Sequence, residues 1–181
     1  GCKQGVKMSV IAQAGAKGRQ LHKFGGSSLA DVKCYLRVAG IMAEYSQPDD
    51  MMVVSAAGST TNQLINWLKL SQTDRLSAHQ VQQTLRRYQC DLISGLLPAE
   101  EADSLISAFV SDLERLAALL DSGINDAVYA EVVGHGEVWS ARLMSAVLNQ
   151  QGLPAAWLDA REFLRAERAA QPQVDEGLSY P

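Results

Sequence analysis

Hydrophobic and polar positions in the first third of the chain follow two different periods. Arg19–Phe24 is a short mixed segment that stops at a pair of glycines, and Met51–Val54 is a continuous apolar run with β-branched residues. Both patterns predict strands, the second a buried one. Between them, apolar residues recur at helical spacing from Leu29 to Met42, which predicts an amphipathic helix of about four turns. Another helix is expected from about Gln63 to Leu70.

A strand, a helix and a second strand in this order predict a βαβ unit with parallel strands. In open parallel sheets, ligands bind beyond the carboxyl ends of the strands. Two unusual loops follow those ends, namely the glycine turn Gly25–Ser28 and the small, polar stretch Ser55–Asn62. We therefore expect both loops to lie at one edge of the sheet and to contribute to one site.

The middle of the chain is predicted to be helical. Apolar stripes mark one helix between Val81 and Leu96 and another from Pro98 to Leu120. A short helix is expected at 125–133, and a separate helix is expected to begin after the glycines around His135 and to carry residues 138–147. Ala155–Leu158 has the pattern of a third strand.

Composition narrows the class of protein. The chain has 181 residues, of which 47% are hydrophobic and 20% charged, as in one globular domain or a large part of one. The net charge is −4 and no long basic run occurs, so nucleic acid and membrane surfaces are not expected partners. There is no membrane-length apolar run and no signal-peptide core, which favours a cytoplasmic location. Cysteines and histidines do not cluster, so no metal site is predicted.

The strongest chemical signal is the run Lys23-Phe24-Gly25-Gly26-Ser27-Ser28. It predicts a lysine at the end of a strand, glycines that let the backbone approach a ligand, and hydroxyls at a helix start. Free amides at a helix start favour an anion, and a lysine adds a mobile charge suited to phosphate. The order of residues differs from a Walker A loop. Judged on these residues alone, a glycine turn beside a surface lysine is the alternative.

This run resembles the N-terminal signature of the aspartate kinases, in the amino acid kinase superfamily. Further stretches resemble motifs of that family in the same order, namely Val54-Ser55-Ala56 with Thr61-Asn62, Gly136-Glu137 with Ser140, and the strand and Asp-x-Arg turn of Ala155–Arg161. The sequence as a whole most resembles the enterobacterial bifunctional aspartokinase/homoserine dehydrogenases of the methionine-regulated type. One departure is that Ser59 stands where some members have glycine, with Gly58 one place earlier.

The resemblance implies an α/β fold, specifically a three-layer α-β-α sandwich with a mainly parallel sheet. Residues 8–181 would form the N-terminal, substrate-side portion of an aspartate kinase domain and would stop before its nucleotide-binding half. Residues 1–7 are interpreted as a remnant outside the natural sequence. The implied parent chain would also carry a homoserine dehydrogenase that uses NAD(P), and the present chain would be inactive alone.

The implied reaction is phosphoryl transfer from ATP, with Mg²⁺, to the side-chain carboxylate of L-aspartate. It gives 4-phospho-L-aspartate, at the start of the pathway to methionine, lysine and threonine. The resemblance assigns Lys23 to catalysis, as the cation that neutralises the transferred phosphoryl group. Gly25, Gly26 and Ser27 would bind phosphate together with Lys23.

The substrate-binding residues implied by the resemblance lie further along the chain. Ser55 and Thr61 are candidates to bind the carboxylates of aspartate, and Glu137 is a candidate to bind its ammonium group. By residue chemistry alone, Glu137 could instead stabilise the dipole of its own helix, and Thr61 could cap the helix that starts near Gln63. His135 is expected to be a structural neighbour of the site.

Two other functions stay open at this point. The chain could belong to an amino acid kinase that acts on glutamate or a carbamate, although the combination of motifs argues against it. It could also be a non-catalytic association module that uses the apolar stripes of residues 77–121. A homo-oligomer is the expected assembly.

Overall fold

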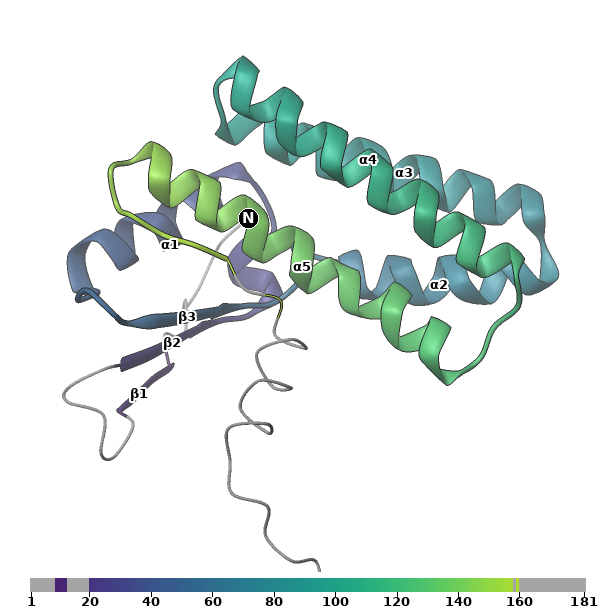
Figure 1. Ribbon diagram of the computed structural model, residues 1–181, viewed down its shortest axis with the longest axis horizontal. Coiled ribbons are helices and arrows are strands. Elements are labelled where there is room, and N and C mark those ends of the chain that lie inside the picture. The colour runs from purple at the N-terminus through teal and green to yellow at the C-terminus, as the bar shows by residue number, and fades with distance from the viewer. Residues whose placement is uncertain (1–8, 13–19, 158, 160–181) are drawn as a thin grey trace, which may run out of the picture.

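The computed structural model describes residues 9–12, 20–157 and 159 (Figure 1). The segment 1–7 and Arg161 of the Asp-x-Arg turn lie outside the described residues. Along the chain, the elements are β1 (Ser9–Ala12), β2 (Gln20–Phe24), the 3₁₀ helix η1 (Gly26–Leu29), α1 (Val32–Tyr45), β3 (Met51–Val54), α2 (Thr60–Thr73), α3 (Arg75–Leu96), α4 (Ala99–Asp121) and α5 (Asp126–Gln150).

The described strands form one sheet in the order β1-β2-β3. Strands β2 and β3 are parallel, with Lys23 opposite Val53 and Phe24 opposite Val54. Helix α1 connects them, so the predicted βαβ unit is confirmed. Strand β1 pairs with β2 in the antiparallel direction and was not predicted. Its four residues carry too little pattern of their own, and the free edge of β2 supplies the hydrogen bonds that make them a strand.

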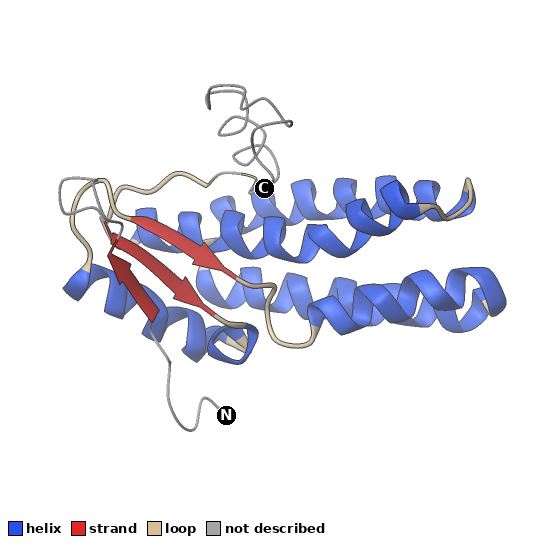
Figure 2. Ribbon diagram, turned by 90° about the horizontal axis from the view of Figure 1, so that it is seen from below, coloured by secondary structure: helices blue, strands red, loops and turns tan. Residues whose placement is uncertain are grey.

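Helices cover one face of this sheet, and Figure 2 shows the strands lying in front of them. Side chains alternate accordingly. His22, Phe24 and Val54 are buried, whereas Lys23 and Val53 are exposed on the other face. The described residues thus contain the sheet and one helical layer, and the predicted α/β class with parallel strands is confirmed.

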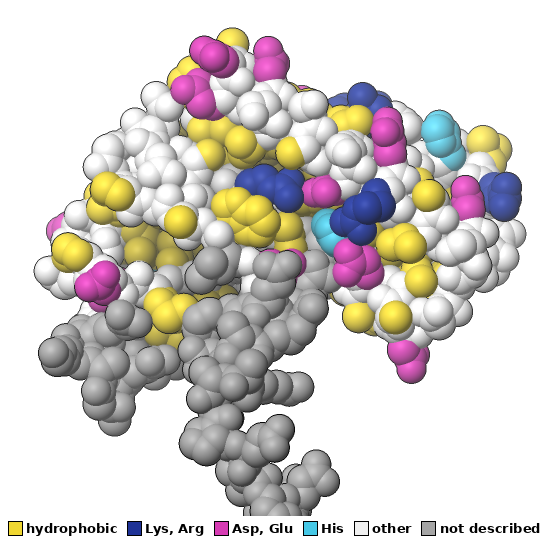
Figure 3. Space-filling model, viewed as in Figure 1, with side chains coloured by type: hydrophobic (Ala, Val, Ile, Leu, Met, Phe, Trp, Pro, Cys, Tyr) yellow, Lys and Arg dark blue, Asp and Glu magenta, His cyan; other side chains and the backbone are white. Residues whose placement is uncertain are grey.

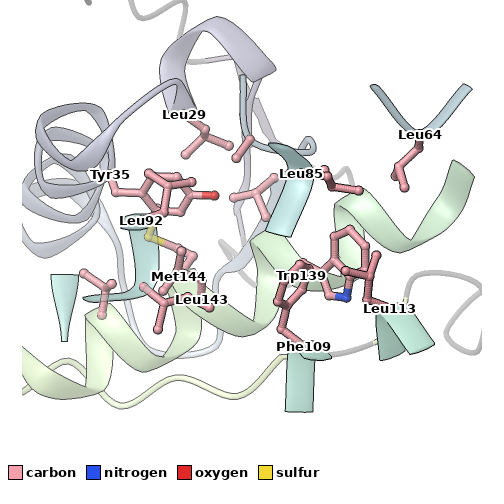
Figure 4. Packing of buried hydrophobic residues seen from close by; sticks show 14 of the residues in the cluster. Leu29, Tyr35, Leu64, Leu85, Leu92, Phe109, Leu113, Trp139, Leu143 and Met144 are labelled. Carbon is pink, nitrogen blue, oxygen red and sulfur yellow. The ribbon is translucent and has the colours of Figure 1, made fainter. Parts of the chain in front are cut away.

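Helices α2 to α5 pack against one another beside the sheet (Figure 1). The expected helices of the middle of the chain are confirmed as α3 and α4. Side-chain caps hold the starts of α3 and α5, where Asp74 accepts from the Ser77 amide and Asn125 accepts from the Val128 amide. In the core, the rings of Phe109 and Trp139 meet edge to face at 4.7 Å (Figure 4). No helix within the described ranges has the length and apolar character needed to cross a membrane.

The prediction of two helices around His135 is wrong, because α5 runs unbroken through Gly134 and Gly136. The reason is packing. A Cβ on Gly136 would lie 2.7 Å from the Ala56 Cβ and 3.2 Å from Thr60 Cγ2. Glycine here permits a close crossing of α5 over the residues that follow β3, and this contact outweighs the cost of glycine in a helix, about 1 kcal/mol.

The predicted strand at Ala155–Leu158 is also wrong for its described residues, since 155–157 are not in a strand. Its backbone groups are used by a helix side chain instead. The Ala155 N–H donates to Asn149 Oδ1 at 2.9 Å, and its carbonyl accepts from Asn149 Nδ2 at 2.8 Å. Ser145 donates to the same carbonyl. Ala155 is therefore hydrogen-bonded to α5 and is not part of a strand.

A buried pair fixes the amino end of β3. Asp50 accepts from the N–H groups of Gln20 and Gln47, and its Oδ2 lies 2.9 Å from His22 Nε2. Both side chains of the His22–Asp50 pair are nearly inaccessible to solvent. Burial raises the pKa of Asp50, but the hydrogen bonds from Gln47, His22 and Gln20 outweigh it and hold this pKa below its ordinary value.

Candidate functional site

The two loops that follow β2 and β3 lie against each other, as the sequence predicted. The Ser55 amide donates to the Phe24 carbonyl at 3.0 Å, and the Gly58 amide donates to the Gly26 carbonyl at 3.2 Å. A Cβ on Gly26 would lie 3.1 Å from the Gly58 carbonyl oxygen and 3.2 Å from that of Ala56. Glycine at position 26 therefore lets the two backbones touch at the carboxyl end of the parallel pair.

Lys23 lies next to this junction. It is the penultimate residue of β2, and its side chain is exposed on the sheet face opposite the buried Phe24. Within the part of the chain that the structure describes, no carboxylate forms an ion pair with it. An exposed cation beside a turn rich in backbone amides suits an anionic ligand.

The turn after Lys23 is the 3₁₀ helix η1, with Gly25 at its N-cap. The Ser28 amide donates to the Gly25 carbonyl at 3.0 Å, which closes the turn. Ser27 is exposed and Ser28 is half-buried. A Cβ on Gly25 would meet no atom of the described residues within 4 Å, so no packing contact among them requires glycine there. The open space beside Gly25 leaves room for another molecule to approach the backbone.

Helix α2 begins at Thr60, earlier than predicted, which places Thr61 in its first turn. Ser55 and Thr61 are both half-buried. The capping alternative for Thr61 is not observed, because the Gln63 amide donates to the Ser59 carbonyl. Ser59 at the N-cap makes no side-chain cap hydrogen bond either. The start of α2 therefore keeps polar groups next to the junction of the loops.

The motif Gly136-Glu137 with Ser140 lies where α5 crosses the second loop. Gly136 packs on Ala56, and Ser140 shares a buried 2.8 Å hydrogen bond with the Tyr35 hydroxyl. Glu137 follows Gly136 directly and is exposed. It lies in the interior of α5, so its interpretation as an acid at a helix start is wrong. The structure brings the backbone of Glu137 close to the second loop, but no ion pair joins it to Lys23 among the described residues.

His135 has a structural role, as expected. Its Nε2 lies 2.8 Å from an Arg115 nitrogen and its Nδ1 lies 2.7 Å from the Glu131 carbonyl oxygen. Because a guanidinium can only donate, this pattern assigns Nε2 as acceptor and Nδ1–H as donor. Arg115 also pairs with Glu131 at 3.1 Å. On the face of the molecule seen in Figure 3, basic, acidic and histidine side chains lie next to one another.

Asp112 and Arg142 form a second ion pair between α4 and α5. Asp112 accepts from Arg142 at 3.0 Å and from the Trp139 ring nitrogen at 3.1 Å. The charges of Asp112, Arg115, Glu131 and Arg142 are therefore paired across α4 and α5. In the described residues, no group of three or more histidine, cysteine, aspartate or glutamate side chains is arranged to hold a metal ion.

Sequence reasoning missed two residues of α3 that contact the loops. The Tyr88 hydroxyl donates to the Ala30 carbonyl at 2.6 Å, and Gln89 Nε2 donates to the Thr60 hydroxyl at 2.9 Å. Tyr88 belongs to an ordinary apolar stripe. The buried amide of Gln89 is the only unusual feature in this turn, and the sequence alone does not show that it is buried.

Comparison with known proteins identifies the family. The model of the Amino acid kinase family matches residues 18–178. The bifunctional aspartokinase/homoserine dehydrogenase 2 of Zea mays is 30% identical over 161 residues, which are 86% of this chain and 17% of that protein. The lysine-sensitive aspartokinase 3 of Escherichia coli is 26% identical over 144 residues, which are 79% of this chain and 31% of that protein.

A solved structure has the same fold. It is E. coli aspartokinase III in complex with aspartate and ADP, with a TM-score of 0.66 and 24% identity, and the match covers 75% of this chain and 30% of that one. The present chain therefore spans less than a third of these relatives. Fold, family model and related sequences agree, and the chain belongs to the amino acid kinase family.

Proposed function

We propose that this chain is the substrate-side portion of an aspartate kinase, which transfers a phosphoryl group from ATP to the side-chain carboxylate of L-aspartate. The observation that carries the proposal is the junction of the two loops at the carboxyl end of β2 and β3, with Lys23 beside it. The names of the related proteins support aspartate as substrate. The bound aspartate and ADP of the E. coli structure belong to that protein and support the same choice.

The reaction must bring two anions together, the triphosphate and the carboxylate. Catalysis of phosphoryl transfer is largely positioning and charge neutralisation. Lys23 is suited to neutralise the transferred group, because its ammonium is exposed and has no carboxylate partner in the described chain. The open backbone at Gly25, with Gly26 and Ser27, would donate hydrogen bonds to phosphate oxygens.

The amino-acid side of the reaction would use the second loop and α5. Ser55 and Thr61 offer hydroxyls to the carboxylates of aspartate. Glu137 offers a carboxylate to the ammonium group, at the point where α5 lies on Ala56. A kinase for aspartate needs both kinds of group at one place, and these residues come from elements that the structure places in contact.

ATP would carry Mg²⁺ to the site on its own phosphates, since the described residues offer no metal cluster. The metal would supply further neutralisation of phosphate charge. A nucleotide-binding half, and a homoserine dehydrogenase with NAD(P), would belong to further parts of a longer polypeptide. The proposal also includes a cytoplasmic homo-oligomer that acts in the pathway to methionine, lysine and threonine. The parent enzyme would be of the enterobacterial methionine-regulated type.

The test is a coupled assay on the complete kinase polypeptide that contains this chain. ATP and Mg²⁺ are supplied with aspartate, glutamate or carbamate in separate reactions, beside a Lys23→Ala variant. We expect turnover with aspartate but not with glutamate or carbamate, and we expect Lys23→Ala to abolish that turnover. Turnover only with glutamate or carbamate would reassign the substrate, and absence of any turnover would favour an association module.

A further inference from the structure

Tyr88 and Gln89, consecutive residues of α3, contact the segments that follow both parallel strands. The Tyr88 hydroxyl bonds to the carbonyl of Ala30, at the end of η1, over 2.6 Å. Gln89 Nε2 bonds over 2.9 Å to the hydroxyl of Thr60, the first residue of α2. A single turn of α3 is therefore joined to the first loop and to the start of the helix that carries Thr61.

Tyr88 also touches the second loop. Gly58 has a positive φ of 50°, and a Cβ built on it would lie 2.6 Å from Tyr88 Oη. The Gly58 amide in turn donates to the Gly26 carbonyl. Tyr88 Oη is therefore hydrogen-bonded to Ala30, just after the first loop, and packed against Gly58 of the second loop. Gly58 is also the residue whose amide joins the second loop to the first.

The hydrogen bonds of Tyr88 and Gln89 place polar groups where apolar side chains could also fill the space. Gln89 and Thr60 are 3% and 0% exposed. Burial raises the pKa of Tyr88, as does the charge of Asp31, so its hydroxyl stays a neutral donor. Buried polar groups are costly unless they are paired, and a satisfied pair fixes the relative position of the groups that it joins.

We propose that Tyr88 and Gln89 are positioning residues of the site, which hold the two loops at the spacing that lets groups from both bind one ligand. The inference rests on the proposed function and adds to it residues that touch neither substrate. Its physical basis is that a displacement of about 1 Å in a positioned group can cost on the order of 100-fold in rate.

The test compares Tyr88→Phe with Tyr35→Phe in the complete kinase polypeptide. Both variants keep the ring and remove one hydroxyl. The Tyr35 hydroxyl bonds to Ser140 over 2.8 Å, and this bond joins α1 to α5 instead of a loop. Tyr88→Phe should lower kcat at saturating substrates by about 10- to 100-fold, with a loss of melting temperature similar to that of Tyr35→Phe. Gln89→Leu should act in the same direction as Tyr88→Phe.

Equal kcat and KM in the two tyrosine variants would overturn the inference while leaving the proposed function intact. A wild-type polypeptide with no aspartate kinase activity would refute the proposed function instead. In that case, amide hydrogen exchange on the 181-residue chain tests whether Tyr88 positions the loops. The Gly58 amide should exchange faster in Tyr88→Phe than in Tyr35→Phe, and equal rates would overturn the inference.

Discussion

The backbone of Gly136 in α5 lies so close to Ala56 that a Cβ at position 136 would come within 2.7 Å of the Ala56 Cβ. Ala56 belongs to the loop after β3, whose backbone touches Gly26 in the loop after β2. A central helix and both loops therefore meet at one point. The residue after the contact, Glu137, is the proposed ligand for the ammonium group of aspartate.

Gly136→Ala should destabilise the chain, because the added methyl group has no room against Ala56 and Thr60. Overpacking of this kind costs about 1 to 3 kcal/mol, and the better helix propensity of alanine offsets roughly 1 kcal/mol of it. Urea denaturation measures the difference. Gly40→Ala in α1 is the matched control, since a Cβ on Gly40 would lie more than 4 Å from the described atoms considered around it. It should stabilise by about 0.5 to 1 kcal/mol, and equal effects of the two changes would refute the close crossing.

Lys23→Ala in the complete kinase should lower kcat by about 100- to 1,000-fold, the usual effect of losing one preorganised group that stabilises developing charge. Stability should hardly change, because the side chain is exposed. Steady-state kinetics and thermal melting measure the two effects. Lys33→Ala, an exposed lysine on α1, should leave both unchanged. Near-normal turnover of Lys23→Ala would mean that Lys23 does not contact the phosphoryl group.

Glu137→Gln should weaken aspartate binding and leave ATP binding nearly unchanged, since it removes a charge but keeps the size of the side chain. Loss of the charge that would pair with the ammonium group should raise the KM for aspartate by about 10- to 100-fold. Glu114→Gln, an exposed glutamate on α4, serves as control and should change neither KM. Similar rises in both KM values for Glu137→Gln would point to a structural role in α5.

Asp50 should make stability depend on pH in the acid range. Its pKa in the folded chain lies below the ordinary value, so the unfolded chain binds the proton more readily. The stabilisation is present above the unfolded pKa of about 3.9 and is lost as the pH falls through the folded pKa. Asp50→Asn should therefore lower stability at pH 7 by about 1 to 3 kcal/mol and flatten the acid decline.

Urea midpoints between about pH 3 and pH 7 measure this dependence. Asp49→Asn is the control, because Asp49 is exposed and has a φ of 74°, a conformation that asparagine adopts readily. It should keep the wild-type pH profile. A profile for Asp50→Asn parallel to wild type would show that the pKa of Asp50 is not lowered by folding.

The 181-residue chain alone should fold but show no aspartate kinase turnover. It carries Lys23, Thr61 and Glu137, yet it spans only 31% of the E. coli aspartokinase. Holding two reactants in line can supply about 7 to 11 kcal/mol of a barrier, and residues outside this chain would hold the nucleotide. A coupled assay with ATP, Mg²⁺ and aspartate, beside Lys23→Ala in the same chain, measures it. Turnover at the level of an intact kinase, abolished in the variant, would contradict the prediction.

Hydrophobic pattern and glycine placement were sufficient to predict β2, α1, β3 and the two loops at their carboxyl ends. Strands β2 and β3 are short segments bounded by turn residues, and a helix between them is the usual connection of two parallel strands in one sheet. That topology places both loops at one edge of the sheet, where the structure brings Gly26 against the Gly58 carbonyl. These features depend on local periodicity and chain connectivity, which a sequence contains.

Tertiary contacts decided the rest. The glycines of α5 predict a break by propensity, and only the packing of Gly136 on Ala56 makes the helix continuous. Ala155 is held by Asn149 instead of a strand, and β1 exists because β2 has a free edge. Tyr88 and Gln89 have the pattern of ordinary helix residues, and only the fold places them against the loops. In each case the deciding free energy comes from residues distant in sequence, and a local pattern does not contain it.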